Sequence, residues 1–419
     1  MRGSTANDWW AVRFCGSAKG WRAVLAVTAP IALCSSAHAA KLVTLHDFCT
    51  TLENNLCSDG QAPASRLLKI GTKLYGFSTV GGATQESILY AVGTSKTFQS
   101  VATFCNESPC PEGMIPGRYL ARGAEGNYYG VTTADATADG GTIFRVSPSG
   151  QVTTVYQFCS LKRCGDGSGP VSVVVDKHGE LFGTTVAGGG YREGTVFRFD
   201  ASGGLKVLHD FCASTSCPDS NTPGALTLGS DGNIYGVTAA GGAVGAGTVF
   251  QITPTGTFNT LYSFCSHNKP VECSDGEEPT PKLAEGPGGD FYGLTSTGGA
   301  DGEGTVFQIT TTGTLKTLYS FCSQTDCDDG EVPADGLVVA ADGSFYGVTT
   351  GGGNYFNGLV FNITASGTYS VVYDFCRLGG CFDGALPQAA PTLSKNGTLY
   401  GTTTAGGDAN EGTVYALTP

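Results

Sequence analysis

The sequence predicts an all-β fold, a seven-bladed β-propeller built from four-stranded antiparallel blades. One unit recurs seven times, about 54 residues apart, across residues 41–419. A repeat of this length cannot bury its apolar side chains alone, so neighbouring copies must stack. Glycine supplies 64 of the 419 residues and charged residues only 14%, which favours short strands and turns over long helices. The two ends of the chain are complementary parts of one unit, which predicts a closed ring.

The unit between Cys322 and Cys376 illustrates the predicted strands. They are residues 336–340, 344–350, 358–364 and 368–376. An Asp342-Gly343 turn joins the first strand to the second, and a glycine-rich loop joins the second to the third. Four short strands connected in this way form an antiparallel meander, which is the sheet of a propeller blade.

The chain ends predict how the ring closes. Residues 41–49 form a fourth strand without its first three, whereas residues 412–419 form a third strand without its fourth. We expect the two to pair, because this pairing removes two exposed sheet edges. The predicted blades of the propeller, residues 40–419, are 50–105, 106–159, 160–212, 213–265, 266–322, 323–376, and 377–419 with 41–49.

Fourteen of the sixteen cysteines form seven local pairs inside the repeat. They are Cys49-Cys57, Cys105-Cys110, Cys159-Cys164, Cys212-Cys217, Cys265-Cys273, Cys322-Cys327 and Cys376-Cys381. An even, locally paired set in an exported chain predicts disulfides, each closing a small loop worth at most about 2 kcal/mol. A zinc site would need four ligands converging on one point, whereas these pairs belong to separate units, so no metal is predicted there.

Residues 1–39 predict an export signal peptide. Four basic residues precede an apolar run, residues 23–34, and an Ala37-His38-Ala39 cleavage pattern follows it. The run is too short to span a bilayer, and no second run follows, so we expect no membrane span in the mature chain. Cleavage near Ala39 would give a secreted or periplasmic protein. It would also lower the net charge from −13 to −16, because residues 1–39 carry +3. Such acidity disfavours nucleic acid as a partner.

An acidic residue stands two positions after the second cysteine of every unit. The seven are Asp59, Glu112, Asp166, Asp219, Asp275, Asp329 and Asp383. A ring of carboxylates is compatible with calcium, which prefers oxygen ligands. Turn formation is the favoured interpretation, because glycine follows six of the seven and aspartate before glycine accepts backbone N–H bonds in tight turns. No cofactor is therefore predicted, and calcium stays as the less favoured alternative.

Three short motifs connect the chain to a known family. The third strand reads Gly-Thr-Val-Phe at Gly194, Gly247 and Gly304, and units also carry Leu-Tyr-x-Phe and Tyr-Gly-x-Thr-x-x-Gly-Gly. In these motifs the chain resembles the GloVer repeat of choice-of-anchor tandem repeat proteins, over all of residues 41–419. The resemblance implies an exported bacterial protein without an assigned activity, and it supplies no catalytic residues.

Positions that break the repeat are the candidates for function. Shortly after the proline of each unit, near the start of the strand that lines the axis, stand Arg66, Arg118, Tyr119, Lys282 and Asp335. We expect these side chains to cluster at the mouth of the channel. Basic groups in a very acidic protein suit an anionic ligand such as a uronate or another carboxylate. Ordinary sequence drift at solvated channel positions is the competing interpretation.

The glycine-rich loops carry a second set of departures, Tyr191, Arg192 and Tyr355. We expect these loops to lie on the same face as the cysteine loops. Exposed aromatic side chains there can stack on sugar rings or anchor a protein partner. Packing within the loops is the competing interpretation.

The leading functional hypothesis is a binding or interaction module for a carbohydrate or a protein, working as a monomer. No histidine has a partner that would support acid-base or triad chemistry, so an enzyme is less favoured. The alternative is a propeller-type polysaccharide lyase or hydrolase that uses Arg118, Lys282 and Asp335. A purely structural surface protein is the third possibility.

Overall fold

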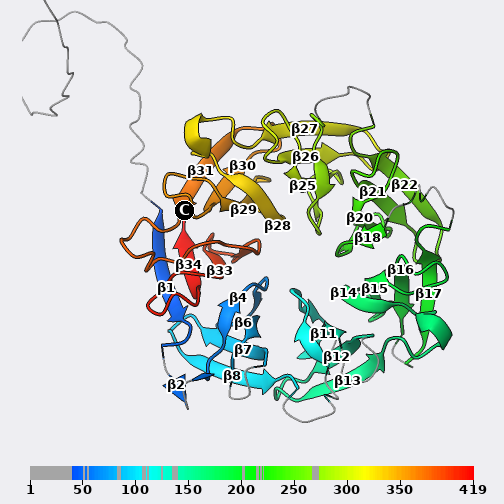
Figure 1. Cartoon of the computed structure of the whole chain (residues 1–419), viewed down its shortest axis with the longest axis horizontal. Helices are drawn as coiled ribbons and strands as arrows, with labels where there is room; N and C mark the ends of the chain where they lie inside the picture. The colour runs from blue at the N-terminus through cyan, green and yellow to red at the C-terminus, as the bar shows by residue number, and fades with distance from the viewer. Residues whose placement is uncertain are drawn as a thin grey trace, which may run out of the picture. The chain divides into compact units, whose positions relative to one another are not determined.

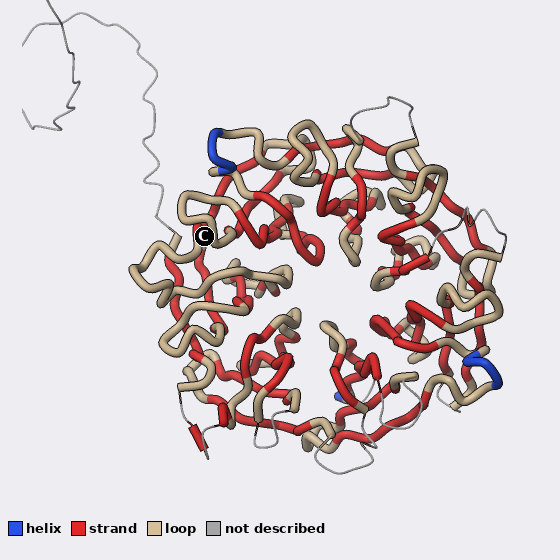
Figure 2. The backbone as a smooth tube through the Cα atoms, in the orientation of Figure 1, coloured by secondary structure: helices blue, strands red, loops and turns tan. Residues whose placement is uncertain are grey.

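The computed structural model describes residues 40–50, 52–53, 56–82, 86–105, 110, 113–123, 126–134, 140–200, 203–213, 217, 219, 221–266 and 273–419. These residues form seven antiparallel sheets arranged around a central channel (Figure 1), which confirms the predicted seven-bladed propeller. Apart from single helical turns such as η2 (Lys162–Cys164) and η3 (Thr325–Cys327), the described chain is strand and loop (Figure 2). None of its helices is long and apolar enough to cross a membrane. The predicted signal peptide lies outside the described residues.

Each blade runs from an innermost strand at the channel to an outermost strand at the rim. The innermost strands, in blade order, are β4 (Gln61–Pro63) with β5 (Leu68–Ile70), β9 (Met114–Pro116) with β10 (Ala121–Arg122), β14 (Ser168–Val175), β18 (Asn221–Pro223) with β19 (Thr227–Leu228), β23 (Glu277–Pro279) with β24 (Ala284–Glu285), β28 (Glu331–Val339) and β32 (Thr392–Leu393). The second strands are β6 (Lys73–Val80), β11 (Tyr128–Ala134), β15 (Leu181–Ala187), β20 (Ile234–Ala240), β25 (Phe291–Thr297), β29 (Phe345–Gly351) and β33 (Leu399–Thr403).

The outer half of each blade is more regular. The third strands are β7 (Ile88–Gly93), β12 (Thr142–Val146), β16 (Thr195–Phe199), β21 (Thr248–Ile252), β26 (Thr305–Ile309), β30 (Leu359–Ile363) and β34 (Thr413–Thr418). The outermost strands are β8 (Phe98–Thr103), β13 (Val152–Gln157), β17 (Leu205–Asp210), β22 (Phe258–Ser263), β27 (Leu315–Ser320), β31 (Tyr369–Asp374) and β1 (Lys41–Asp47). A two-stranded ribbon, β2 (Leu52–Glu53) and β3 (Leu56–Cys57), lies in the first cysteine loop.

The N-terminal strand closes the ring as predicted. β1 pairs antiparallel with β34, from Lys41 opposite Thr418 to Asp47 opposite Thr413. It is therefore the outermost strand of blade 7, whose other strands come from the C-terminal end of the chain (Figure 1).

The core lies between adjacent blades, and the repeated aromatic residues build it. The phenylalanine of each Phe-Cys motif is fully or almost fully buried against the third-strand aromatic of the next blade. Phe264 of blade 4, for example, lies 5.2 Å from Phe307 of blade 5, ring centroid to centroid, in an edge-to-face contact. Such contacts, repeated around the ring, explain why the Phe-Cys and Gly-Thr-Val-Phe motifs recur together.

Glycine is required where these aromatic rings cross their own sheet. Gly293 in β25 stands opposite Phe307 in β26, and a Cβ at Gly293 would lie 2.4 Å from the ring. Gly304 has φ +98°, and a Cβ there would meet the carbonyl of Thr295 and the ring of Pro333 in the next blade. The repeated glycines and prolines are therefore packing residues.

The innermost strands are less regular than predicted. Four of them are split in two, and in β28 the register shifts between Ala334 and Val338. In each of these blades the innermost strand is interrupted just after the repeated proline. The residues at this interruption are the ones that differ from unit to unit. Such irregularities turn a side chain away from the sheet. In this protein they direct the divergent side chains into the channel.

Candidate functional site

All seven predicted cysteine pairs form disulfides, one in each loop between an outermost strand and the next innermost strand. They indicate an oxidising compartment, extracellular or periplasmic. Within the described residues, three potential metal ligands converge at two places, and both contain a disulfide, Cys212-Cys217 or Cys265-Cys273. Sulfurs joined in a disulfide are not free thiolate ligands.

The repeated aspartates organise these cysteine loops. The buried carboxylate of Asp329 accepts hydrogen bonds from the backbone N–H groups of Ser323 (3.0 Å) and Gln324 (3.2 Å), and from the Ser323 hydroxyl (2.7 Å). The Tyr319 hydroxyl donates to the same carboxylate at 2.5 Å. Burial, and next this hydrogen bond, raise the pKa of Tyr319 to about 12. This geometry supports the turn interpretation of the acidic positions, and Glu112 lies outside the described residues.

Two blades use histidine where others use tyrosine. His46 and His209 lie 3.0 and 2.8 Å from the carboxylates of Asp59 and Asp219. Each imidazole also stacks on a phenylalanine of the next outermost strand. These histidines therefore hold cysteine loops at the rim.

Four of the predicted site residues meet inside the channel, in a layer that we call the septum: Arg66, Tyr119, Lys282 and Asp335. The Tyr119 hydroxyl of blade 2 donates across the channel to the Asp335 carboxylate of blade 6. That carboxylate also accepts the backbone N–H of Ala390 at 2.8 Å. Burial, and next the charge of Asp335, raise the pKa of Tyr119 well above its ordinary value. The septum lies within the channel rather than at its mouth, because the irregular strand stretches aim these side chains inward.

Within the described part of the chain, each of the two septum cations donates a side-chain hydrogen bond to a backbone carbonyl oxygen. The Arg66 guanidinium reaches from blade 1 to the carbonyl of Leu337 at 3.3 Å. The Lys282 ammonium donates to the carbonyl of Leu226 at 3.0 Å and lies 5.2 Å from the centre of the Tyr119 ring. Among the described residues, neither cation forms an ion pair within 4.0 Å. Burial, and next the nearby Arg66 charge, lower the pKa of Lys282 to about 8.

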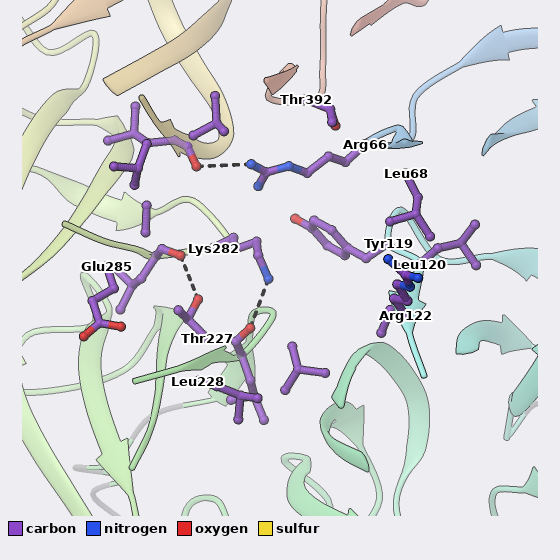
Figure 3. A pocket seen from close by; sticks show the side chains of 18 of the residues that line it. Arg66, Leu68, Tyr119, Leu120, Arg122, Thr227, Leu228, Lys282, Glu285 and Thr392 are labelled. Carbon is purple, nitrogen blue, oxygen red and sulfur yellow. Dashed lines mark hydrogen bonds between the residues drawn. The ribbon is translucent and has the colours of Figure 1, made fainter. Parts of the chain in front are cut away.

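Beyond the septum the channel widens into a cavity of about 570 Å³, which we call the turn-side cavity. Its wall is formed by residues at the C-terminal ends of all seven innermost strands. The cavity therefore lies on the side of the propeller where turns connect the first strand of each blade to the second. Arg66, Tyr119 and Lys282 form its inner end, and Figure 3 shows them pointing toward a common space from different strands. Sequence reasoning missed the rest of this wall, because its leucines and valines look like ordinary strand residues.

A second cavity of about 550 Å³ lies on the cysteine-loop side of the septum. Tyr119 lines both cavities, whereas Arg118 lines only this one. The Arg118 guanidinium bonds to the backbone carbonyl and the side-chain carbonyl of Gln388, at 3.3 and 3.2 Å. The structure therefore separates Arg118 from Arg66 and Lys282, which face the turn-side cavity.

The loop candidates lie apart from both cavities. Tyr191 is 54% exposed and Tyr355 is 46% exposed, on glycine-rich loops of blades 3 and 6, and Arg192 adjoins Tyr191 with a left-handed backbone. Near Tyr355, Phe356 is 64% exposed. The adjacent Asn357 accepts a backbone hydrogen bond from Leu386 of blade 7. Aromatic side chains are therefore exposed on these loops, but the structure does not bring them to the septum.

Comparison with known families agrees with the repeat seen in the sequence. A family model described as the Gloeobacter/Verrucomicrobia repeat matches residues 40–228 and 216–415. None of the curated proteins matches the chain.

Solved structures share the fold at low sequence identity. PorZ, a surface component of the type-IX secretion system of Porphyromonas gingivalis, is 12% identical with a TM-score of 0.54, over 84% of this chain and 46% of PorZ. A puromycin hydrolase is 13% identical with a TM-score of 0.54, over 82% of this chain and 50% of the hydrolase. A gluconolactonase from Xanthomonas campestris is 14% identical with a TM-score of 0.44, over 85% and 98% of the two chains. This chain spans about half the length of the first two proteins, and the likeness to those two shows the fold alone.

Proposed function

The chain belongs to the Gloeobacter/Verrucomicrobia repeat family, and from that premise we propose that it is an exported binding protein whose channel holds a small organic anion. The ligand occupies the turn-side cavity, and its anionic group lies against the septum. Carboxylates are the class of ligand that this arrangement fits.

The observation that carries the proposal is a pair of cations that, among the described residues, form no ion pair within 4.0 Å. Arg66 and Lys282 face one cavity, and each uses one hydrogen bond to a carbonyl oxygen. Placing like charges together in a partly desolvated site is unfavourable unless an anion compensates them. The Asp335 carboxylate of the septum compensates part of this positive charge, because its charge raises the pKa of Lys282, and one negative charge against two positive ones leaves the remainder to a ligand.

The enzyme alternative has less support from the geometry. A lyase or hydrolase that uses Arg118, Lys282 and Asp335 needs all three groups around one substrate. Arg118 faces the cysteine-side cavity and Lys282 faces the turn-side cavity. A purely structural role would account for the hydrogen bonds by which Arg66 and Lys282 connect different blades, and the variants below distinguish it from ligand binding.

Export completes the proposal. The seven disulfides support a protein that matures outside the cytosol. We place the signal-peptide cleavage site after Ala39, directly before the strand that closes the ring.

Calorimetric titration of the purified chain with small carboxylates tests the proposal. We expect saturable binding that weakens about 10- to 100-fold in Lys282→Met, since a hydrogen bond to a charged group contributes about 1.5–3 kcal/mol. Lys316→Met is the matched control, because Lys316 is an exposed lysine on the rim strand β27. If no carboxylate binds, or if both variants weaken binding equally, the proposed function is wrong.

A further inference from the structure

We infer that the ligand is a carboxylate with an unbranched aliphatic tail, its head at the septum and its tail along the turn-side cavity. This inference rests on the proposed function and narrows its ligand class. A fatty acid of short to medium length has the required chemistry, and a uronate does not.

The wall of the turn-side cavity is mostly aliphatic. Leucine, valine or alanine residues from every blade line it, and half-buried examples are Leu68, Leu120, Leu228 and Val338, which also pack against the hydrophobic cores between blades. Tyr119 is the only aromatic side chain among the described residues that line it, and it lies at the septum. Sugar sites depend on aromatic platforms and many polar partners, whereas an aliphatic wall gains free energy by burying methylene groups.

Most polar side chains on this wall are already bonded within the protein. The Thr227 hydroxyl donates to the carbonyl of Leu283 at 2.7 Å, and the Thr392 hydroxyl donates to the carbonyl of Leu67. The Glu285 carboxylate accepts the backbone N–H of Ser230 at 2.9 Å. A uronate would have to bury several hydroxyl groups against this wall with few partners, and each unpaired hydroxyl is unfavourable.

The charges give the cavity a direction. Arg66 and Lys282 lie at its inner end, whereas Arg122 is exposed and Glu285 is half-buried near the turn side. A carboxylate at the septum lies against both inner cations, and an aliphatic tail then extends along the aliphatic wall toward the mouth. Burial, and next the Arg66 charge, lower the pKa of Lys282, whereas the Asp335 charge raises it. A ligand carboxylate beside the ammonium would act in the same direction as Asp335, by favouring the charged form of the lysine.

Calorimetric titration of the full chain with butyrate, hexanoate and octanoate tests the inference. We expect the affinity to rise about fourfold with each added methylene, the factor that corresponds to about 0.8 kcal/mol for each buried CH₂. Octanol, which has the same tail without the charge, should bind at least about tenfold more weakly than octanoate. Lys282→Met should remove most of this difference, and Lys316→Met should leave it unchanged.

The outcomes separate the inference from the proposed function. If galacturonate binds as tightly as octanoate, or if affinity does not depend on tail length, the aliphatic ligand class is wrong while the anion site stands. If octanoate binds equally well to Lys282→Met, it occupies another place, and the inference is again overturned. If no carboxylate binds, both fail. Melting temperatures of the variants, measured alongside, show whether each variant is folded.

Discussion

Lys282→Met should stabilise the unliganded protein, although Lys282 lies inside the channel and bonds to the chain. Methionine keeps much of the length of the lysine side chain and removes its charge. If the septum served only to hold the propeller together, the same substitution would destabilise it. The sign of the effect therefore distinguishes a ligand-binding lysine from a structural one.

The expected size follows from two opposing contributions. The pKa of Lys282 is lowered from 10.5 to about 8, and this shift of about 2.5 units corresponds to about 3 kcal/mol that disfavours the charged folded state. Loss of the hydrogen bond to the Leu226 carbonyl offsets about 1 kcal/mol of that gain, and the partial exposure of the side chain reduces it further. A net stabilisation of about 1–2 kcal/mol remains, or about 1–3 °C in Tm for a domain of this size.

The pH dependence of this difference gives the sharper assay. Between pH 8 and 10.5 the unfolded lysine binds a proton that the folded lysine has released, so the stability of the wild type rises with pH in this window. The advantage of Lys282→Met should therefore be complete below pH 8, shrink between pH 8 and 10.5, and give way to a small disadvantage near pH 10.5, where only the lost hydrogen bond remains. Scanning calorimetry of both proteins across this range measures it. A variant that melts lower than the wild type at pH 7 would refute the reasoning.

Three further predictions concern the fold and its export. Asp329→Ala should lower stability by about 3 kcal/mol or more, because four hydrogen bonds to a buried carboxylate are lost, and chemical denaturation beside the exposed Asp301→Ala measures it. Gly293→Ala should cost about 1–3 kcal/mol through collision with Phe307, and Phe307→Leu should relieve part of that cost, so strictly additive effects would contradict the packing argument. N-terminal sequencing of the exported protein should begin at Ala40, and an intact Met1 would exclude cleavage.

The repeat determined most of what could be predicted about the fold. Phe264 and Phe307 belong to motifs that recur from unit to unit. Residues that recur in this way are expected to make the same packing contact between each pair of neighbouring blades. The complementary ends of the chain predicted the pairing of β1 with β34 for the same reason. The Tyr-Gly motif marks Gly293 in the sequence, whereas its contact with Phe307 is visible only in the structure.

The site was harder to predict, because it depends on departures from strand regularity. The positions of Arg66, Tyr119, Lys282 and Asp335 were found by comparing units, since they break the repeat. The direction in which these side chains point could not be predicted in this way. Alternation of apolar and polar residues assigns side chains to the two faces of a continuous strand, and these innermost strands are interrupted. Arg118 illustrates the difficulty, since it precedes Tyr119 in the chain yet faces the opposite cavity. The aliphatic wall was missed because Leu68 and similar residues also suit an ordinary strand.

Ring closure links the fold to the proposed site. Arg66 comes from blade 1 and Lys282 from blade 5, so no single blade or adjacent pair of blades contains the site. Their separation is fixed only when the blades between them complete the circle, and β1 holds the last of these blades together. Weakening the pairing of β1 with β34 should therefore reduce anion binding before the individual blades unfold. In this view the residues that recur in every unit form a rigid ring. The residues that differ between units, Arg66 and Lys282, bring two cations from distant blades to one cavity, and no single unit could form this site alone.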